Sequence, residues 1–421
     1  MVHYIPLLSL TLNKHKIIND PVHGFIKIPT DTLFDLLEHP YIQRLRRIKQ
    51  LGLTSLVYPG ATHTRFQHAL GAMHLMSQSI DNIRQKGLVI TDAEAEAASA
   101  AILMHDIGHG PFSHALEQSI IPDLTHEDIS CLLMYGLNDE FRGKLDLALL
   151  IFKNQYSKQF LHQLVSGQLD MDRMDYLLRD SFYTGVAEGT IGTERILKML
   201  CVVNDQLVVE SKGIYSIEKF LIARRLMYWQ VYFHKTVIAA ENILVKTLQR
   251  AKFIAMKDPD IPASEALAFF LRNRITREDL KTSKELVIEK FTSLDDDDIF
   301  VSAKAWVNYP DTLLSHLAGC LLKRNLSRVR IQDEPFEESY IQRLKQRVQD
   351  RFALDAEDSG WLVYQGSISN HAYSGEDEKI RILFKDGTIK DLAVASDLFN
   401  VSILTKPSVK YFLCYPKECE V

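Results

Sequence analysis

The stretch that decides the fold is AAILMHDIGHGP, residues 100–111. It closes an alanine-rich run that begins after Thr91, and Glu94 follows that threonine by three residues, the spacing of a helix capping box. The run predicts a buried helix, and the glycines and proline after it predict where that helix stops. His105 and Asp106 are therefore expected at the end of a buried helix, where an imidazole and a carboxylate can turn into one cavity.

Histidine is concentrated around this stretch. Seven of the fifteen histidines lie from His63 to His126. Histidine is the commonest transition-metal ligand and a general acid–base group near neutral pH. The clustering indicates a metal or acid–base site, although we interpret His63 and His74 as ordinary core or surface histidines.

A basic segment overlaps the histidine cluster. Residues 39–80 contain five lysines and arginines and neither aspartate nor glutamate, so the segment should attract an anion. We interpret Arg44 and Arg47 as solvated residues of a helix face. Arg65 differs, because it precedes His68 by three residues and shares its face if a helix starts after Thr64.

A second polar stripe lies downstream, in LDMDRMDYLLRD, residues 169–180. This segment predicts the start of a helix on which Asp172, Tyr176 and Asp180 are four residues apart and form one stripe. The interleaved apolar residues bury the rest of the helix. The stripe is therefore expected to line a polar site rather than to face solvent.

The overall composition excludes several classes of protein. The 421 residues are 46% hydrophobic and 24% charged, an ordinary globular balance that argues against disorder and coiled coil. A net charge of -5 argues against a protein that coats duplex nucleic acid. No apolar stretch reaches the ~18 residues of a membrane span. The chain starts without a signal-peptide pattern and its five cysteines form no Cys-x-x-Cys pair, so we expect a reduced, cytoplasmic protein without a thiolate zinc site.

These residues resemble a known family. His68, His105, Asp106 and Asp172 match the four-residue H…HD…D signature of HD-domain metal-dependent phosphohydrolases. The flanking motifs resemble the deoxynucleoside triphosphate (dNTP) triphosphohydrolase branch, which includes the animal sterile-alpha-motif HD-domain enzymes and their bacterial relatives. The motifs are NDPVHG (19–24), QRLRRIKQLG (43–52), YPGATHTRFQH (58–68) and HDIGHGPFSH (105–114). The resemblance, clear from about residue 16 to about residue 235, implies a mainly helical fold with an HD-domain core and a small α+β C-terminal region.

The resemblance also implies a reaction. The four signature residues would bind a divalent ion, and two imidazoles with two carboxylates suit Fe, Mn, Mg, Ni or Zn. The family reaction is attack of water on the α-phosphorus of a dNTP, which releases a deoxynucleoside and tripolyphosphate. By position, the implied acid that protonates the departing 5′-oxygen is His109, assisted by His126 and oriented by Glu117.

The implied substrate pocket grips a triphosphate and selects a sugar. Charge-assisted contacts to the triphosphate would come from Arg65, His114, Arg173, Tyr176 and Arg224. Gln50 and Asp180 match positions that bond the 3′-hydroxyl, whereas Leu51 and Tyr232 would crowd the 2′ position and reject ribose. Tyr228 stands where the animal enzymes have a histidine, which leaves the base preference open.

A further set resembles the positions at which the family binds activating nucleotides between subunits. These residues are Lys16, Asn19, Glu38, Gln43, Arg46, His234 and Lys235. Glu38 replaces the family's usual aspartate near the guanine of the activator but keeps a carboxylate acceptor. A nucleotide activator and a homo-oligomer, dimeric or tetrameric, are therefore expected, with an ordinary oligomer surface as the alternative.

The pattern along the chain predicts four regions: an N-terminal arm (1–15), a catalytic core (16–257), a helical extension (258–334) and an α+β region (335–421). Helical patterns cover residues 216–257 and 265–272, and the acidic run 295–298 predicts a solvated turn. In the last region we predict a hairpin of residues 380–384 and 388–394 and further strands at 401–404 and 409–414.

Three alternative functions remain open. Another HD-domain phosphohydrolase, acting on a cyclic nucleotide, guanosine tetraphosphate or a nucleoside monophosphate, would keep the metal ligands without needing Gln50, Asp180 and Tyr232. A non-catalytic nucleotide sensor would not need both His109 and His126. A single-stranded nucleic-acid binder would use residues 44–49 and show a steeply salt-dependent affinity.

Overall fold

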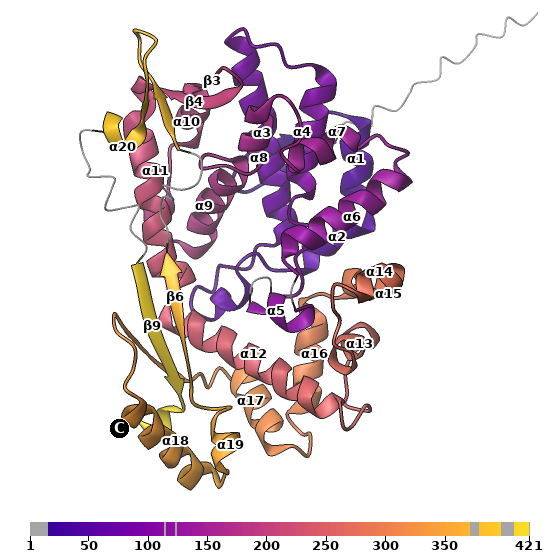
Figure 1. Cartoon of the computed structure of the whole chain (residues 1–421), viewed down its shortest axis with the longest axis vertical. Helices are drawn as coiled ribbons and strands as arrows, with labels where there is room; N and C mark the ends of the chain where they lie inside the picture. The colour runs from indigo at the N-terminus through magenta and orange to yellow at the C-terminus, as the bar shows by residue number, and fades with distance from the viewer. Residues whose placement is uncertain (1–15, 113–114, 123, 371–378, 397–407, 421) are drawn as a thin grey trace, which may run out of the picture.

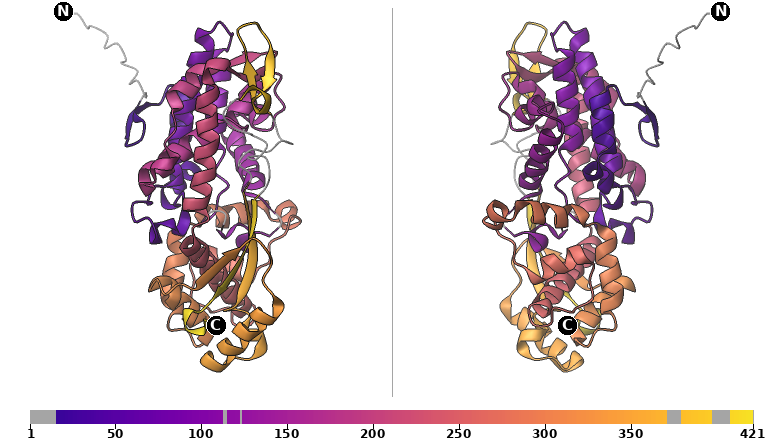
Figure 2. Two further views of the ribbon diagram at one scale, coloured as in Figure 1. Left: turned by 90° about the vertical axis from the view of Figure 1, so that its left-hand side faces the viewer. Right: turned by 90° about the vertical axis from the view of Figure 1, so that its right-hand side faces the viewer.

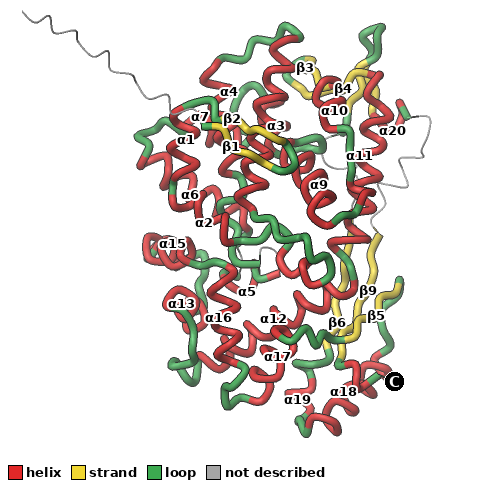
Figure 3. The backbone as a smooth tube through the Cα atoms, turned by 180° about the vertical axis from the view of Figure 1, so that it is seen from behind, coloured by secondary structure: helices red, strands yellow, loops and turns green. Residues whose placement is uncertain are grey.

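The computed structural model describes residues 16–112, 115–122, 124–370, 379–396 and 408–420. Within them the chain is mainly helical with three small sheets, as predicted. Figure 1 shows two parts along the long axis, with the N-terminal helices in the upper part and α12 to α19 in the lower part. Seen from behind, the strands form small groups in an otherwise helical molecule (Figure 3). No helix in the described residues combines the length and the apolar character that crossing a membrane requires.

The upper part is a helical bundle built around α3 (Arg65–Gln85), which packs against α4 (Asp92–Met104) and α9 (Met171–Thr184). Shorter helices surround this trio: α1 (Asp31–Glu38), α2 (Pro40–Arg44), α6 (His126–Glu140), α7 (Asp146–Phe152), α8 (Gln159–Val165) and α10 (Thr193–Met199). A hairpin of β1 (Ile17–Asp20) and β2 (Gly24–Lys27) stands out from the bundle (Figure 2).

α4 begins and ends where the sequence predicts. The hydroxyl of Thr91 accepts a hydrogen bond from the Glu94 N–H at 3.2 Å, and the Glu94 carboxylate accepts one from the Thr91 N–H at 2.8 Å. Residues 97–104 are all buried, so the hydrophobic effect anchors the second half of the helix. His105 and Asp106 follow directly and are therefore held by a rigid, buried element.

Glu94 also ties the start of α4 to the segment before α8. Its side chain accepts hydrogen bonds from the Tyr156 hydroxyl at 2.6 Å and the Lys158 ammonium at 2.8 Å. Burial opposes the charge, but these bonds prevail and lower the pKa of Glu94 from 4.5 to about 2. The ionised carboxylate therefore stabilises the fold above pH 4.5, and this contribution is lost as the pH falls from 4.5 towards 2.

We expect Glu94→Gln to lower the free energy of unfolding by about 1–3 kcal/mol at pH 7, because the amide loses the charge-assisted bonds. The loss should shrink at about pH 3, because the carboxylate of the unfolded chain is then mostly protonated and less of the stabilisation of the ionised folded form remains. Urea denaturation at both pH values measures the difference. An equal loss at both values would contradict an ionised Glu94 as the stabilising group.

The helix predicted over residues 216–257 is broken in the structure. It consists of α11 (Ile214–Met227), a π-helical segment η6 (Tyr228–Tyr232) and α12 (Lys235–Ala255). The break is capped by His234, whose ring Nδ1 accepts a hydrogen bond from the Thr236 N–H at 3.2 Å. Apolar periodicity continues across the break and hides it from the sequence. π-Helical segments are frequent at functional sites.

The lower part packs helices beside an antiparallel sheet. Its helices beyond α12 are α13 (Glu265–Arg272), α14 (Asp279–Thr282), α15 (Lys284–Ser293), α16 (Asp296–Trp306), α17 (Thr312–Leu322), α18 (Glu338–Phe352) and α19 (Ala356–Ser359). The sheet has the order β5 (Arg328–Gln332), β9 (Ser408–Tyr415), β6 (Tyr364–Asn370). It crosses residue 334, where the sequence placed a boundary, because β5 pairs with β9.

Another small sheet joins the C-terminal region to the upper part. Its order is β3 (Leu200–Val203), β4 (Gln206–Glu210), β7 (Arg381–Leu383), β8 (Ile389–Asp391). The predicted hairpin is confirmed, with a positive φ of 84° at the turn residue Gly387, but its end folds into α20 (Leu392–Ala395). β9 confirms the strand predicted at 409–414, whereas residues 401–404 lie outside the described residues.

Two predictions about charged residues are wrong. Arg44 is not solvated: it is 1% exposed and donates to the carbonyls of Leu294 at 2.8 Å, Ile107 at 3.2 Å and His109 at 2.6 Å. The acidic run is not a solvated turn either, because its first residues begin α16 and are buried; the carboxylate of Asp296 accepts from the backbone N–H groups of Lys49 and Phe112 at 3.0 and 2.8 Å. These buried polar contacts connect the lower part to the loop after α4.

Candidate active site

Three helices bring the four predicted metal ligands together. His68 lies on α3, His105 and Asp106 follow α4, and Asp172 lies in the first turn of α9. The His68 Nε2 atom is 3.1 Å from Asp172 Oδ1 and 3.8 Å from Asp106 Oδ2. The His105 Nε2 atom is 3.2 Å from Asp106 Oδ1 and 3.6 Å from Asp172 Oδ1. Of these, His68, His105 and Asp172 form a group whose ligand atoms are close enough to share one ion.

His68 and His105 both direct their Nε2 atoms towards the carboxylates of Asp106 and Asp172. His68 Nδ1 is bonded to Asp175 Oδ2 at 2.8 Å, and His105 Nδ1 to the Ile102 carbonyl at 2.6 Å. With Nδ1 as the donor, the lone pair lies on Nε2. Both Nε2 atoms are buried and have no hydrogen-bond partner among the described residues. Two orphaned lone pairs beside two carboxylates fit a divalent metal ion.

The histidines and aspartates of the cluster shift each other's pKa values strongly. Burial raises the pKa of Asp172, but the nearby imidazole rings of His105 and His68 outweigh it and hold the pKa below its usual range. Burial lowers the pKa of His68, yet the carboxylates of Asp172 and Asp175 prevail and raise the pKa to about 10, so a metal ion bound here would replace the proton on Nε2. The carboxylates therefore stay ionised and can neutralise a cation held between them.

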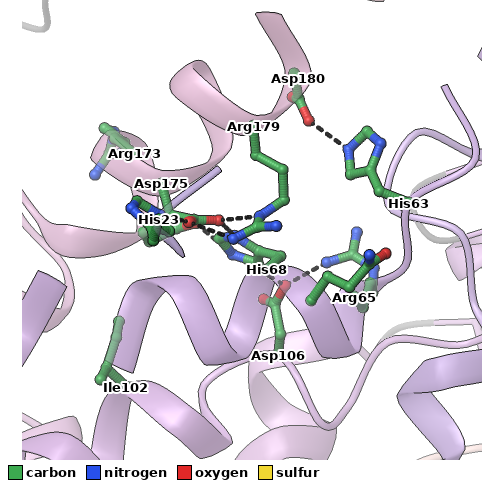
Figure 4. Close-up of polar contacts among 12 residues, drawn as sticks. His23, His63, Arg65, His68, Ile102, Asp106, Arg173, Asp175, Arg179 and Asp180 are labelled. Atoms are coloured by element: carbon green, nitrogen blue, oxygen red, sulfur yellow. Dashed lines mark hydrogen bonds and ion pairs between the residues drawn. The ribbon is translucent and has the colours of Figure 1, made fainter. Parts of the chain in front are cut away.

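A buried network that the sequence analysis missed holds His68 in place. Asp175 bonds His68 with one oxygen and His23 Nε2 with the other, at 2.6 Å (Figure 4). Arg179 donates to Asp175 at 2.9 and 3.0 Å and to Asp20 at 2.8 Å. The signal was present in the sequence, since Asp175 and Arg179 have the i, i+4 spacing of a helical ion pair. Such outer contacts fix the orientation and basicity of a metal-binding histidine.

Gly71 makes room for this network. A Cβ atom at this position would lie 1.9 Å from Asp175 Oδ1 and 2.3 Å from Arg179 Nη2. Any larger residue on that turn of α3 would therefore displace the ion pair. Because residue 71 is a glycine, the charged side chains of Asp175 and Arg179 can pack against α3 close to His68.

His109 and His126 lie beside Asp106. The His109 Nε2 atom is 3.3 Å from Asp106 Oδ1, and the rings of His109 and His126 stack with their centroids 4.0 Å apart. Burial, reinforced by the charge of Arg65, lowers the pKa of His109 well below its usual range. His109 is therefore neutral at pH 7, and an anion placed near Arg65 would raise its pKa again.

Gly108 allows this stacking. A Cβ there would lie 2.1 Å from the His126 carbonyl oxygen and 2.3 Å from the Ser130 nitrogen, so only glycine lets the loop approach α6 this closely. The side chain of Glu117 and the whole of His114 lie outside the described residues. Their roles as orienting residue and triphosphate contact stay predictions.

A cavity of about 380 Å³ opens beside the cluster and is lined by most of the predicted substrate contacts. These are Gln50, Leu51, Arg65, Tyr176, Asp180, Tyr228 and Tyr232. Arg65 connects the cavity to the candidate ligands, because its guanidinium pairs with Asp106 (Figure 4). The cavity therefore combines a buried cation with a polar wall next to the proposed metal position.

Asp180 organises one wall of this cavity, the wall that the sequence analysis predicts to contact the sugar. One carboxylate oxygen is bonded to His63 Nε2 at 2.8 Å and the other accepts from the Tyr232 hydroxyl at 2.7 Å. His63 is a buried histidine, as interpreted from the sequence, with Nε2 bonded to Asp180 and Nδ1 without a partner among the described residues. Gln50 Oε1 is buried without a partner among the described residues, so it is available to a ligand hydroxyl.

Two of the predicted triphosphate contacts do not line this cavity. Arg173 donates to the carboxylate of Asp170 and the carbonyl of Gly167, and Figure 4 shows it apart from the Arg65–Asp106 pair. Arg224 is buried on α11, with 9% of its surface exposed. Arg173 would have to leave Asp170 in order to reach a phosphate.

The predicted activator residues fall into separate groups. Lys16 pairs with Glu38 at 3.8 Å, and Arg46 donates to Gln43 at 2.8 Å, on the side of the β1–β2 hairpin, where Asn19 also lies. His234 and Lys235 instead line a cavity of about 720 Å³ in the lower part. This cavity is rich in cations, with Arg324, Arg328, Lys410 and Lys417.

Comparisons with known proteins agree with this geometry. The HD domain model matches residues 65–180, which contain all four candidate ligands, and the HD associated region matches residues 191–265. A crystal structure of a phosphohydrolase from Bacteroides thetaiotaomicron is 54% identical, with a TM-score of 0.92 over 95% of this chain and 99% of that chain. The chain belongs to the HD-domain phosphohydrolases.

Relatives divide into two kinds. The uncharacterized protein YwfO of Bacillus subtilis is 34% identical over 97% of this chain and 93% of its own length. The deoxynucleoside triphosphate triphosphohydrolase SAMHD1 homolog of Dictyostelium discoideum is 32% identical over 65% of this chain, and human SAMHD1 is 29% identical over 58%. The chain spans about half the length of these triphosphohydrolases, 56% and 46% respectively.

Proposed function

We propose that this protein hydrolyses dNTPs at the α-phosphorus to a deoxynucleoside and tripolyphosphate. The observation that carries the proposal is the position of the orphaned His68 and His105 nitrogens next to a cavity with Arg65 at one side and the Asp180–Tyr232 pair at another. The likeness to triphosphohydrolases over more than half of the chain supports the choice of substrate.

In the proposed site, His68, His105, Asp106 and Asp172 hold a divalent ion. Such an ion supplies a Lewis acid that lowers the pKa of water and polarises a phosphoryl oxygen. Asp175 keeps the His68 ring oriented through the Nδ1 bond. Arg65, paired with Asp106, contributes a fixed positive charge against the negative charge that develops on the phosphate.

His109 protonates the leaving group. A water oxygen forms the new bond to the α-phosphorus, the bond from phosphorus to the 5′-oxygen breaks, and His109 delivers a proton to that oxygen. The pKa of His109 is low in the free protein because of burial and Arg65. The bound triphosphate offsets the Arg65 charge, so a protonated His109 becomes accessible only when substrate is present.

Sugar selection comes from the opposite wall. The 3′-hydroxyl donates to Gln50 Oε1 beside Asp180, and the Tyr232 ring, held by its bond to Asp180, occupies the space that a 2′-hydroxyl would need. A pocket that offers an added hydroxyl neither space nor a free hydrogen-bond partner rejects it by about 100-fold. The bonded Tyr232 hydroxyl meets that condition.

Product analysis tests this proposal against the other HD-domain reactions. The metal-loaded protein is incubated with each dNTP and NTP, alone and in pairs, and separately with cyclic nucleotides, guanosine tetraphosphate and nucleoside monophosphates. Several divalent ions are compared, and the products are separated by chromatography. Deoxynucleoside and tripolyphosphate in equal amounts are expected. Hydrolysis of cyclic nucleotides, guanosine tetraphosphate or monophosphates without tripolyphosphate would point to another member of the family, and no turnover with any ion would point to a sensor.

We further propose that a nucleotide activator binds the cation-rich cavity at the start of α12. Five lysines and arginines line it together with His234, Trp229 and Phe233, a combination suited to a polyphosphate and a base. The site would act between subunits of a dimer or tetramer. The cavity supports this proposal because two of the predicted activator residues, His234 and Lys235, line it.

Lys235→Ala should raise the nucleotide concentration needed for half-maximal activation by about 3–10-fold, and lower the basal rate less, because one charge-assisted contact is lost. Lys219→Ala, which removes an equivalent charge from an exposed position on α11, is the matched control. Activation curves for the two variants and the wild type measure the effect. Superimposable curves would contradict an effector site at Lys235.

A further inference from the structure

One acidic side chain in the 380 Å³ cavity has no role in the reaction described so far. Glu241 lies on α12 and lines the cavity together with Tyr228 and Phe233. Asp180, the other carboxylate in the lining, has both oxygens engaged by His63 and Tyr232. Glu241, in contrast, forms no hydrogen bond or ion pair with any residue that the structure describes. Its carboxylate is available to a ligand.

The fold places Glu241 on a different wall from the candidate metal ligands. α12 packs chiefly against α17, α13, β5 and η2 (Gly52–Leu56), and Figure 1 shows it in the lower part of the molecule. The ligands come from α3, α4 and α9 in the upper part. In the binding mode proposed above, with the α-phosphate at the ligands and the 3′-hydroxyl at Asp180, the base would extend towards α12, whose Glu241 lines the same cavity.

We propose that Glu241 reads the nucleobase and selects guanine, an inference that rests on the proposed hydrolysis of dNTPs. A carboxylate accepts two parallel hydrogen bonds, and among the four bases guanine alone offers two adjacent donors, N1–H and the N2 amino group. Adenine and cytosine set a ring-nitrogen lone pair beside their amino group, and thymine flanks its single N–H with carbonyl oxygens. Each of these would repel one carboxylate oxygen.

The surroundings of Glu241 favour such a ligand. Tyr228 and Phe233 supply flat apolar surface for a base beside the carboxylate. Burial raises the pKa of Glu241 to about 7, since a charge on this wall has no compensating partner. Guanine donors would compensate it. Assays at pH 8 keep the carboxylate ionised in wild-type protein and so test the proposed contact directly.

The experiment compares kcat/KM for dGTP, dITP, dATP, dCTP and dTTP at pH 8, with tripolyphosphate as the measured product. dITP retains N1–H but lacks the N2 amino group. Wild-type protein should prefer dGTP to dITP and to the other three nucleotides by about tenfold or more. Glu241→Gln should lower kcat/KM for dGTP by about tenfold or more, with a smaller effect on the others, because its amide cannot accept both bonds. The matched control is Glu285→Gln, an exposed glutamate of α15.

Failure of this inference is distinguishable from failure of the proposed function. If tripolyphosphate is released from dGTP and dITP with equal kcat/KM, or if Glu241→Gln weakens all nucleotides equally, the base assignment is wrong while dNTP hydrolysis stands. If no nucleotide yields tripolyphosphate, both fall together. The comparison of dGTP with dITP uses unaltered protein, so it decides the question even if the Glu241→Gln variant does not fold.

Discussion

Asp106→Asn should remove bound metal and reduce turnover by at least about 1,000-fold. Asp106 lies within 3.2 Å of the His105 nitrogen and 3.8 Å of the His68 nitrogen, and it also pairs with Arg65. The amide keeps the shape of the side chain but supplies no charge to a cation and leaves Arg65 without its buried counter-ion. Two contributions to phosphate chemistry are therefore lost together.

Metal content by mass spectrometry and the rate of tripolyphosphate release are the measurements for this variant. Asp81→Asn, an exposed position on α3, should retain both metal and activity and is the matched control. Thermal unfolding verifies that each variant is folded. A folded Asp106→Asn protein with normal metal content and full activity would remove the proposed site.

The second large effect is expected from a residue that touches neither metal nor substrate in the proposed mechanism. Asp175→Asn should weaken metal binding by about 10–100-fold, because an amide can present its nitrogen to His68 Nδ1 and no longer fixes the ring tautomer. The same change leaves Arg179 in a buried site with only Asp20 as an acidic partner. Breaking a buried ion pair in this way costs about 3–5 kcal/mol of stability.

The two consequences of Asp175→Asn can be separated. Titration of metal-free protein with Mn²⁺ measures binding, and chemical denaturation measures stability. His23→Gln removes the other histidine partner of Asp175 without uncovering Arg179, so it should reduce stability much less. If Asp175→Asn binds Mn²⁺ as tightly as the wild type, the network supports the fold but does not orient a metal ligand.

The sequence was most informative where local signals agree with one another. The capping box at Thr91, the buried alanine-rich run and the glycines after it fix both ends of α4 and hence the position of His105 and Asp106. The His68 position follows similarly from the start of α3 after Thr64, whose N–H donates to the Gln67 side chain at 2.9 Å. Short-range chemistry therefore determines each candidate ligand, and tertiary packing of three helices determines only how they meet.

Other features depend on contacts that a linear pattern does not contain. The neighbours of Arg44 in the sequence include other cations, so the sequence analysis interpreted this residue as solvated. In the structure its guanidinium is buried and donates hydrogen bonds to three backbone carbonyls from distant segments. Asp296, the first residue of α16, is likewise buried, because it accepts bonds from backbone groups that lie far away in the chain. The division at residue 334 missed the pairing of β5 with β9 for the same reason. Long-range satisfaction of buried polar groups has no periodicity to detect.

The most direct test of the account is hydrolysis of dGTP by the metal-loaded protein in water enriched in ¹⁸O, followed by mass spectrometry of both products. Attack of water on the α-phosphorus predicts one ¹⁸O atom in tripolyphosphate and none in deoxyguanosine. Label in deoxyguanosine would mean attack at carbon, formation of dGMP and pyrophosphate would mean cleavage of the bond between the α- and β-phosphates, and formation of dGDP and inorganic phosphate would mean cleavage of the bond between the β- and γ-phosphates. Any of these results would contradict the reaction proposed for this cluster of two histidines and two aspartates.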